Sequence, residues 1–331
     1  MTTIRDVALH CGVSTATVSR ALTGKGYIRE DLQRQIREGA QKLGYRPNLV
    51  ARNLRSNRST TIGLVVADVQ NPYFTRICRA VEDEAMRHGY AVFLCNTDED
   101  PAREELYLRH LVDENVAGVI LAPTGKTERI AAMLERLLLP LVLIDRPVLS
   151  DTCDTVRIDN ELAAQELTQH LLEHNRRNIV GLFGSNSTTG AARAQGFRQA
   201  IEQKGASASD HPQIFLAAGE EDGYRVVHEL LRNGSRPDAL LASSGLIAIG
   251  AYRALLESEY HCPEQIAFAA FDEAGWCNLV RPAVTVIEQP TYEIGSAATE
   301  LLIKRIEEPE RAKRQLVLRH SMLIRNSCGC H

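Results

Sequence analysis

Short apolar runs alternate with longer amphipathic stretches through most of the chain, and this alternation restricts the fold more than any other feature of the sequence. From residue 61 onward, the runs occupy residues 62–66, 91–94, 116–121, 141–144, 179–183, 239–242 and 266–271. Segments with helical spacing, such as residues 76–88, separate them. Continuous apolar strands between helices are typical of parallel sheets that are covered on both faces. Because about 270 residues are many for one such sheet, the pattern predicts an α/β fold with two parallel sheets.

The charge of the chain divides near residue 58. The whole chain carries a formal charge of −4, with 38 Lys and Arg against 42 Asp and Glu. Residues 1–58 contain eleven basic and four acidic side chains, a charge of +7, which leaves −11 for the remainder. A basic head on an acidic body is expected when one end of a chain meets phosphate and the other does not.

The basic head has the pattern of three short helices. Thr3 and Asp6 have the spacing of a capping box, and apolar residues with helical spacing follow them. Gly12 suits a left-handed helix end, and Ser14 can cap a second helix. A third helix is expected at about 29–43. Two short helices joined by a tight turn that contains glycine indicate a helix-turn-helix.

The outward face of the second helix carries the most information in the head. Helical spacing places four residues together there: Thr15, Ala16, Ser19 and Arg20. Small side chains allow a helix to approach the floor of the major groove, where Ala16 can contact a thymine methyl group and Arg20 can bind guanine through two hydrogen bonds. The alternative is an ordinary solvated face. The turn, the caps and the positive charge together favour DNA binding.

The segment after the third helix is expected to act as a hinge. Pro47 disfavours helix in the residue before it, and Asn48 can cap the stretch 49–56. This stretch is too short to be a stable helix alone in water, so we expect it to become ordered only against a partner. Leu54 can serve as a wedge between base steps of the minor groove, or it can pack locally.

Five segments of the head and hinge resemble the lactose-repressor (LacI/GalR) family of bacterial transcription regulators: residues 3–8, 12–14, 17–20, 44–48 and 51–54. The resemblance implies an all-α helix-turn-helix headpiece at 1–46, a hinge at 47–58 and a core for effector binding and dimerisation at 59–331. It implies base reading by Thr15, Ala16, Arg20 and Leu54. It also implies phosphate contacts from Ser14, Thr17, Tyr45 and Arg52.

Polar side chains follow several of the expected strands, where ligands of open α/β sheets bind. Carboxylates, amides, hydroxyls and aromatic rings together suit a small polyhydroxylated molecule, because each buried hydroxyl needs a partner. Loop solvation and helix capping are the alternative for any one of these residues. The candidates for effector binding are Asn71, Tyr73, Phe74, Arg146, Asp159, Arg193, Ser244, Asp272, Trp276 and Gln289.

The resemblance extends through this body, where the family has a two-lobed core like that of periplasmic sugar-binding proteins. It implies an N-lobe at about 60–159 and 290–320, and a C-lobe at about 160–289 and 321–331. Arg193 and Asp272 are the strongest ligand candidates. The chain departs from the family at 243–245, where Ser-Ser-Gly replaces a common Asn-Asp pair. Loss of that carboxylate, beside the retained Arg193 and Arg146, favours a sugar acid of the gluconate or 2-ketogluconate type over a neutral sugar, with Trp276 as a stacking face.

These features predict a homodimeric repressor that binds a pseudo-palindromic operator in double-stranded DNA and is controlled by a small sugar or sugar-acid effector. No catalytic residue, cofactor or membrane partner is expected. A periplasmic-type binding protein for transport is one alternative, which the absence of a signal peptide disfavours. An enzyme of sugar-acid metabolism is another, but the sequence contains no phosphate loop, dinucleotide fingerprint or nucleophile elbow.

The cysteines fit a cytoplasmic protein. No apolar run approaches the ~20 residues of a membrane span, so we expect a reducing compartment and free thiols. Six of the eight cysteines lie within apolar patterns and are expected in the core. The remaining two, Cys328 and Cys330, have the spacing of metal ligands. Because no second pair completes a tetrahedral site, we expect a surface tail there.

Overall fold

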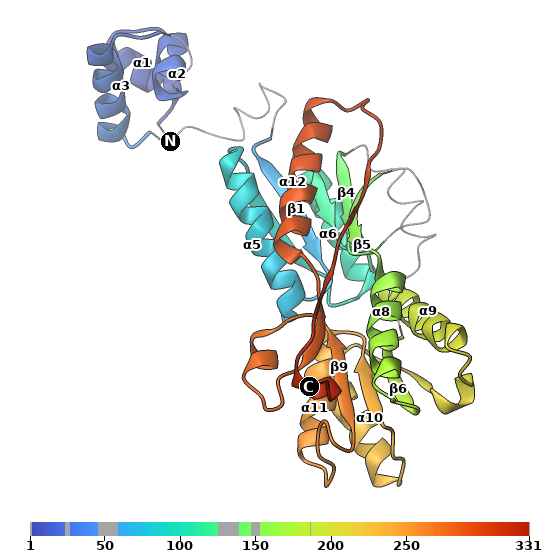
Figure 1. Cartoon of the computed structure of the whole chain (residues 1–331). Helices are drawn as coiled ribbons and strands as arrows, with labels where there is room; N and C mark the ends of the chain where they lie inside the picture. Colours follow the sequence, from blue (N-terminus) through green and yellow to red (C-terminus); the bar gives the residue numbers. More distant parts are fainter. Residues whose placement is uncertain are drawn as a thin grey trace. The chain divides into compact units, whose positions relative to one another are not determined.

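The computed structural model describes residues 2–23, 27–45, 59–124, 139–146, 153–185 and 187–330. The chain forms two compact units, Met1–Ser59 and Thr60–His331 (Figure 1). The expected hinge at 47–58, with Arg52 and Leu54, lies outside the described residues. Within the described ranges, no helix is long and apolar enough to cross a membrane.

The first unit contains the three expected helices, α1 (Ile4–Cys11), α2 (Thr15–Thr23) and α3 (Glu30–Lys42). At the start of α1, the backbone N–H and the hydroxyl of Thr3 both donate to the Asp6 carboxylate, at 2.7 and 2.8 Å. These bonds favour the ionised form and lower the pKa of Asp6. Gly12 ends α1 with φ at 65°, as the left-handed helix end requires.

A small apolar core holds these helices together. The fully buried side chains include Val7 from α1, Val18 and Ala21 from α2, and Ile36 from α3. The side chain of Gln33 donates from Nε2 to the carbonyl of Ala21 at 3.2 Å, which fixes α3 against the end of α2. The predicted helical head is therefore confirmed.

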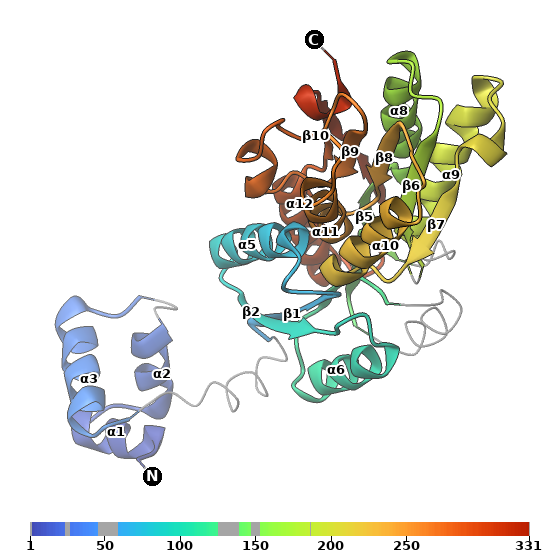
Figure 2. The same ribbon diagram turned by 90° about the horizontal axis from the view of Figure 1, so that it is seen from below.

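The N-lobe of the second unit is a fully parallel sheet between helices. Its strands, in spatial order, are β11 (Gln315–Leu318), β5 (Asp154–Ile158), β4 (Leu141–Ile144), β3 (Val119–Leu121), β1 (Thr61–Val66) and β2 (Ala91–Asn96). Its helices are α5 (Pro72–Arg87), α6 (Pro101–Asp113) and α12 (Thr291–Glu307). The helices α5 and α12 lie side by side on one face of the sheet, and α6 covers the other (Figure 2).

The C-lobe repeats this architecture. Its strands, in spatial order, are β12 (Ser321–Leu323), β10 (Thr285–Glu288), β9 (Ala267–Phe271), β8 (Ala239–Ala242), β6 (Ile179–Gly184) and β7 (Gln213–Leu216). Only β12 among these is antiparallel to its neighbour. Its helices are α8 (Asn160–Glu173), α9 (Thr188–Gln203), α10 (Glu220–Arg232) and α11 (Gly245–Leu256), with short helical turns at Ala208–Asp210, Gly275–Asn278 and Asn326–Cys328.

Burial on both faces of the central strands explains why the sequence shows continuous apolar runs. In β1, Leu64 and Val66 pack toward α5, while Val65 packs with Leu108 and Leu111 of α6. In the C-lobe, α8 and α9 contribute to one core cluster and α10 and α11 to another. Both faces of each sheet are covered, so both sets of side chains must be apolar. The predicted α/β fold with two largely parallel sheets is confirmed.

The chain passes between the lobes after β5, after β10 and again between β11 and β12. The runs predicted as strands coincide with seven of the observed strands, whereas β5, β7, β10, β11 and β12 were not predicted. These strands are short, and β11 and β7 lie at sheet edges where several side chains remain exposed. Each of these two strands is four residues long and begins with glutamine, so it contains only three apolar residues, fewer than the four to eight that indicate a strand.

We predict that Gly196→Ala lowers the free energy of unfolding, because α9 packs closely on α8. A Cβ atom at Gly196 would overlap the backbone carbonyl oxygen of Glu161. Helix propensity alone would make the alanine favourable by about 1 kcal/mol, but overpacking of this kind costs about 1–3 kcal/mol. Urea denaturation measures the difference.

Gly275→Ala is the matched control, because no described atom lies within 4 Å of the place that its new Cβ atom would take. Equal stability of the Gly196→Ala variant and the wild type would show that the two helices can separate without cost.

Candidate functional site

The face of α2 that was predicted to contact DNA is exposed. Thr15, Ala16, Ser19 and Arg20 are all accessible, while Val18 and Ala21 on the opposite face are fully buried. The Ser14 hydroxyl accepts a hydrogen bond from the backbone N–H of Thr17 at 3.1 Å and so caps the helix. The exposed face of α2 therefore carries three small side chains and one guanidinium.

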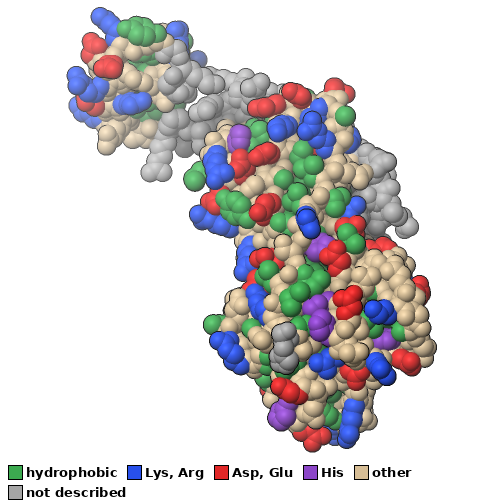
Figure 3. All heavy atoms as spheres, viewed as in Figure 1, with side chains coloured by type: hydrophobic (Ala, Val, Ile, Leu, Met, Phe, Trp, Pro, Cys, Tyr) green, Lys and Arg blue, Asp and Glu red, His purple; other side chains and the backbone are tan. Residues whose placement is uncertain are grey.

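Three of the residues predicted to contact phosphate, Ser14, Thr17 and Tyr45, lie within the described part of the first unit, whereas Arg52 lies outside it. Ser14 is exposed and Thr17 is half-buried, and their hydroxyl groups are 2.9 Å apart. Tyr45 is half-buried and packs against the apolar core of the head. Lys and Arg side chains are spread over the visible face of this unit (Figure 3). The first unit therefore combines an exposed helix face with a positively charged surface.

A polar cavity of about 330 Å³ lies where the two lobes meet. Its lining comes from both lobes, mostly from residues that follow strands. Asp68, Glu99 and Asp145 follow β1, β2 and β4. Gln289 follows β10 at a crossover. From the C-lobe come Gly184, Ser187, Thr189, Gly190, Arg193, Ala217, Ala218, Gly219, Asp222, Ser243, Ser244, Leu246 and Asp272. The carboxyl ends of the strands meet at this cavity, as open α/β sheets require of a ligand site.

Arg146 is buried in the N-lobe wall between the carboxylates of Glu99 and Asp145. Its Nη1 atom donates to Glu99 at 2.6 Å and to the carbonyl of Pro123 at 3.1 Å, and its Nη2 atom donates to the other oxygen of Glu99. Its Nε atom lies 3.3 Å from the Asp145 carboxylate. Burial alone would lower the pKa of Arg146, but Glu99 and Asp145 raise it above its ordinary value. This guanidinium therefore brings no unneutralised charge to the cavity.

Arg193 projects from α9 into the C-lobe side of the cavity. Its Nε atom donates to Asn160 at 2.8 Å and its Nη1 atom donates to the Ser243 carbonyl at 2.5 Å. The guanidinium carbon lies 4.1 Å from the centre of the Phe271 ring, within cation–π distance. These contacts fix the plane of the guanidinium in the wall of the cavity.

Asp272 is held in position from two directions. Its Oδ2 atom accepts from the backbone N–H of Gly245 at 3.0 Å, and its Oδ1 atom accepts from the Gln289 side chain at 2.7 Å. Its φ of 73° is matched by a φ of 66° at Asp145, which follows a strand in the other lobe. Left-handed backbone is uncommon for residues other than glycine, and aspartate tolerates it better than most. In both lobes this turn brings a carboxylate to the cavity.

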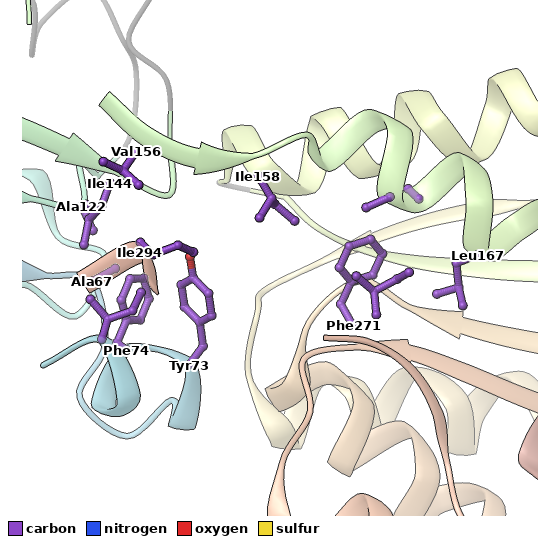
Figure 4. Packing of buried hydrophobic residues seen from close by; sticks show 14 of the residues in the cluster. Ala67, Tyr73, Phe74, Ala122, Ile144, Val156, Ile158, Leu167, Phe271 and Ile294 are labelled. Atoms are coloured by element: carbon purple, nitrogen blue, oxygen red, sulfur yellow. The ribbon is translucent and has the colours of Figure 1, made fainter. Parts of the chain in front are cut away.

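The aromatic wall of the cavity comes from the start of α5. Asn71 caps this helix by accepting from the backbone N–H of Tyr73 at 3.0 Å. The rings of Tyr73 and Phe74 meet edge to face, with centroids 5.0 Å apart (Figure 4). Burial, together with the charges of Asp145 and Asp272, raises the pKa of Tyr73 well above its ordinary value. Tyr73 therefore stays a neutral phenol that can donate a hydrogen bond.

Two of the predicted effector residues do not line the cavity. Asp159 accepts from the backbone N–H of Leu162 at 3.0 Å and acts as the N-cap of α8. Trp276 packs against Tyr252, with ring centroids 5.5 Å apart, in the apolar cluster behind the C-lobe sheet. Trp276 is therefore not part of the cavity lining, and its expected stacking role has no support in this structure. The other candidates all line the cavity, and their contacts with an effector stay a prediction: Asn71, Tyr73, Phe74, Arg146, Arg193, Ser244, Asp272 and Gln289.

The charge of the cavity gives no support to the predicted preference for a sugar acid. Five carboxylates line it, against two guanidinium groups. The five are Asp68, Glu99, Asp145, Asp222 and Asp272. The two arginines can be recognised in the sequence, but the acids that surround them in space cannot. An anionic guest would have to enter this excess of negative charge at short range, where such repulsion is poorly screened.

Sequence reasoning missed Glu99 and Asp222. Glu99 lies in an acidic run after β2, where solvation was the simpler interpretation. Asp222 lies in the first turn of α10, directly after β7. Because β7 was not predicted as a strand, no expected strand end pointed to Asp222. The positive φ of 57° at Glu99 can be seen only in the structure.

The head exposes the outer face of α2, and the two-lobed core has a cavity lined by polar residues. Together, these two features define the class of ligand-responsive DNA-binding regulators. Comparison with protein families agrees with this class. Residues 3–48 match the bacterial regulatory proteins of the lacI family, and residues 59–326 match the periplasmic binding proteins and sugar binding domain of the LacI family. The chain belongs to the LacI family of transcriptional regulators.

Individual relatives span nearly the whole chain. The ribose operon repressor of Halalkalibacterium halodurans is 36% identical over 311 residues, which are 93% of this chain and 91% of that protein. The lac repressor dimer bound to operator and the anti-inducer ONPF has the same fold, with a TM-score of 0.87, 22% identity and 99% coverage of both chains. A LacI family regulator from Enterococcus faecium with bound ribose has a TM-score of 0.73 and 28% identity, and covers 81% of this chain and 98% of its own.

Proposed function

We propose that this protein is a homodimeric repressor whose affinity for operator DNA is controlled by a neutral sugar bound between the lobes. The observation that carries the proposal is the cavity itself, where carboxylates, an amide, a phenol and a fixed guanidinium converge from both lobes. Such groups match the alternating donors and acceptors of a polyhydroxylated ring. Ribose is the first candidate, because a relative named as a ribose operon repressor is 36% identical.

The headpiece supplies the DNA-binding half of the proposal. The exposed α2 face would enter the major groove, with Thr15, Ala16 and Arg20 at the base edges and Ser14, Thr17 and Tyr45 near phosphate. Hinge residues Arg52 and Leu54 keep the roles that the family resemblance implies. The hinge sequence is too short to form a stable helix alone, so we expect it to become ordered only on DNA. The effector can then act on a segment whose helix is only marginally stable.

We predict that Arg20→Ala reduces the discrimination between operator and unrelated DNA. Loss of a side chain that reads a base should cost about 1–3 kcal/mol with the operator and much less with other sequences. Fluorescence anisotropy with operator and scrambled duplexes at fixed salt measures both affinities.

Arg37→Ala is the matched control, because it removes one exposed guanidinium from α3 of the same head. It should weaken binding to both duplexes by a similar factor, since a phosphate contact carries no sequence information. If Arg20→Ala also weakens both duplexes equally, base reading by α2 is refuted.

The cavity favours an uncharged effector with several hydroxyl groups. Gln289 donates to Asp272, while its Oε1 atom has no hydrogen-bond partner among the residues that the structure describes. A buried carbonyl oxygen without a partner costs free energy, which a ligand hydroxyl would recover. The paired carboxylate oxygens of Asp145 and Asp272 can accept further bonds from hydroxyls on both sides of a ring.

We predict that ribose raises the melting temperature of the protein, while ribonate and gluconate do not. A ligand at about 100 times its dissociation constant stabilises the folded state by about 2.7 kcal/mol. Differential scanning fluorimetry with a panel of neutral sugars and the matching acids tests this directly.

Asp272→Ala should abolish the rise in melting temperature that ribose causes. Asp238→Ala should retain this rise, because Asp238 is not part of the cavity lining. A shift produced by the acids alone would restore the sugar-acid hypothesis and overturn the neutral effector.

The edge of the N-lobe sheet supports the homodimer. β2 is the last strand of that sheet, and its Phe93 and Leu94 side chains are 47% and 51% exposed. Met86, near the end of the neighbouring α5, is 70% exposed. An apolar edge strand of this kind is normally protected by pairing or packing. A second copy of the chain would cover it and would place two heads on the two halves of a palindromic site.

We predict that Leu94→Glu shifts the protein from dimer to monomer and weakens operator binding. A charge placed in a desolvated interface costs several kcal/mol. Sedimentation velocity over a range of concentrations measures the association.

Leu162→Glu provides the control, because Leu162 is also a half-exposed leucine, 45% accessible, but lies on α8 of the other lobe. A dimer that survives Leu94→Glu unchanged would exclude β2 from the interface.

A further inference from the structure

The sequence predicts that Cys328 and Cys330 lie on a surface tail, but the structure does not place them there. Cys328 is 0% exposed and lies in the short helical turn Asn326–Cys328, against the C-lobe core. Its Sγ atom is 2.9 Å from Sγ of Cys330, which in turn is 3.2 Å from Nε2 of His170 on α8. The tail therefore folds back and brings two thiols against a histidine from a segment about 160 residues earlier in the chain.

We propose that His170, Cys328 and Cys330 form a binding site for a thiophilic d¹⁰ cation, either Zn²⁺ or Cu⁺. The three ligand atoms lie within 4.8 Å of one another, and His170 is only 8% exposed. Thiolates and imidazole are the ligands that these cations prefer. With metal–sulfur bonds of ~2.3 Å and metal–nitrogen bonds of ~2.0 Å, ligand atoms around one ion lie roughly 3.5–3.8 Å apart. The cluster reaches this spacing by side-chain adjustments of roughly 1 Å.

The backbone prepares the two cysteines for a common ion. Gly329 lies between them with φ at 82°, a left-handed conformation that glycine adopts without strain. This turn places both sulfur atoms on the same side of the chain. A side chain at position 329 would overlap the Arg176 guanidinium, so the glycine also permits that close approach.

Neighbouring groups hold the ligands in place. The Nδ1 atom of His174 is 2.7 Å from the backbone carbonyl of His170, and the two imidazole rings lie 4.6 Å apart. The Thr285 hydroxyl donates to Sγ of Cys328 at 3.2 Å. The Arg176 guanidinium donates to the carbonyl of Cys328 at 3.4 Å and so holds the backbone of this turn. Such outer contacts orient metal ligands and raise affinity.

The site would join two segments that act on different parts of the core. Cys328 and Cys330 end the segment that returns from the N-lobe through β11 and β12. His170 lies on α8, whose first residue, Asn160, fixes Arg193 in the cavity. A bound ion would therefore clamp the end of the chain to the helix that supports the effector site. The fourth position around the ion remains for water, because Cys330 is only half-buried.

The test uses the full-length, reduced, metal-free protein, with Zn²⁺ and Cu⁺ added in separate titrations against chromophoric chelators. One equivalent of ion per chain is expected to resist the chelator in at least one of the two titrations. Cys330→Ser and His170→Gln should each weaken that binding by at least about tenfold, since even outer contacts are worth 10- to 100-fold. Cys95→Ser changes a half-buried cysteine in the other lobe and should bind like the wild type.

Co²⁺ provides a spectroscopic readout of the same site. Thiolate-to-cobalt charge-transfer absorption is expected in the wild type and should decrease in Cys330→Ser, which changes a partly exposed residue and so keeps the fold. Retention of Zn²⁺ alone or Cu⁺ alone identifies the ion. Failure to retain either ion, or equal affinity in the wild type and in both ligand variants, would overturn the proposal.

Discussion

Burying an ionised side chain between two lobes costs several kcal/mol unless opposite charge and hydrogen bonds compensate for the lost water. Arg146 meets this requirement through Glu99, Asp145 and a backbone carbonyl. Arg193 meets it through Asn160, Ser243 and the Phe271 ring. The lobes can enclose a polar cavity only because these partners are in place before any ligand arrives. Preorganised groups of this kind reduce the ordering cost of binding.

The same network explains how a small molecule could act on both lobes. The Gln289 side chain, beside a crossover between the lobes, bonds to Asp272 of the C-lobe, while Asp145 contributes the matching carboxylate from the N-lobe. A ligand that bonds to both carboxylates favours the arrangement in which they face each other. It shifts a conformational equilibrium only to the extent that it binds one state more tightly than the other. The effector and the operator then influence each other's affinity by the same factor.

The fold was largely predictable because its strongest signals are local. The Thr3–Asp6 cap, the glycine at position 12 and the buried face of α2 each follow from short-range spacing. Fully covered central strands show as continuous apolar runs. The strand β5 was missed because Asp154 and Arg157 interrupt its apolar residues, and β7 and β11 were missed because each contains only three apolar residues after a glutamine.

The site was less predictable, since its chemistry depends on contacts between distant segments. The sequence shows Arg146, but it does not show that Glu99, 47 residues away, neutralises it. That single pairing removes much of the argument for a sugar acid. Asp159 and Trp276 carry side chains that suit a sugar ligand. In the structure, however, Asp159 caps α8 and Trp276 packs in an apolar cluster. Likewise, His170 lies 160 positions from Cys330, so no spacing rule could join them.

In the proposed mechanism, an uncharged sugar in the cavity controls the affinity of the headpiece for operator DNA. The most direct measurement is the dissociation constant for an operator duplex, taken at one salt concentration with and without ribose at a level that saturates the protein. Coupling free energies of about 1–3 kcal/mol correspond to a change of roughly 5- to 150-fold. With ribose bound, we expect the affinity for the operator to fall by a factor in this range, and we expect no change in the Asp272→Ala variant. An operator affinity that stays the same while the sugar is bound would contradict this mechanism.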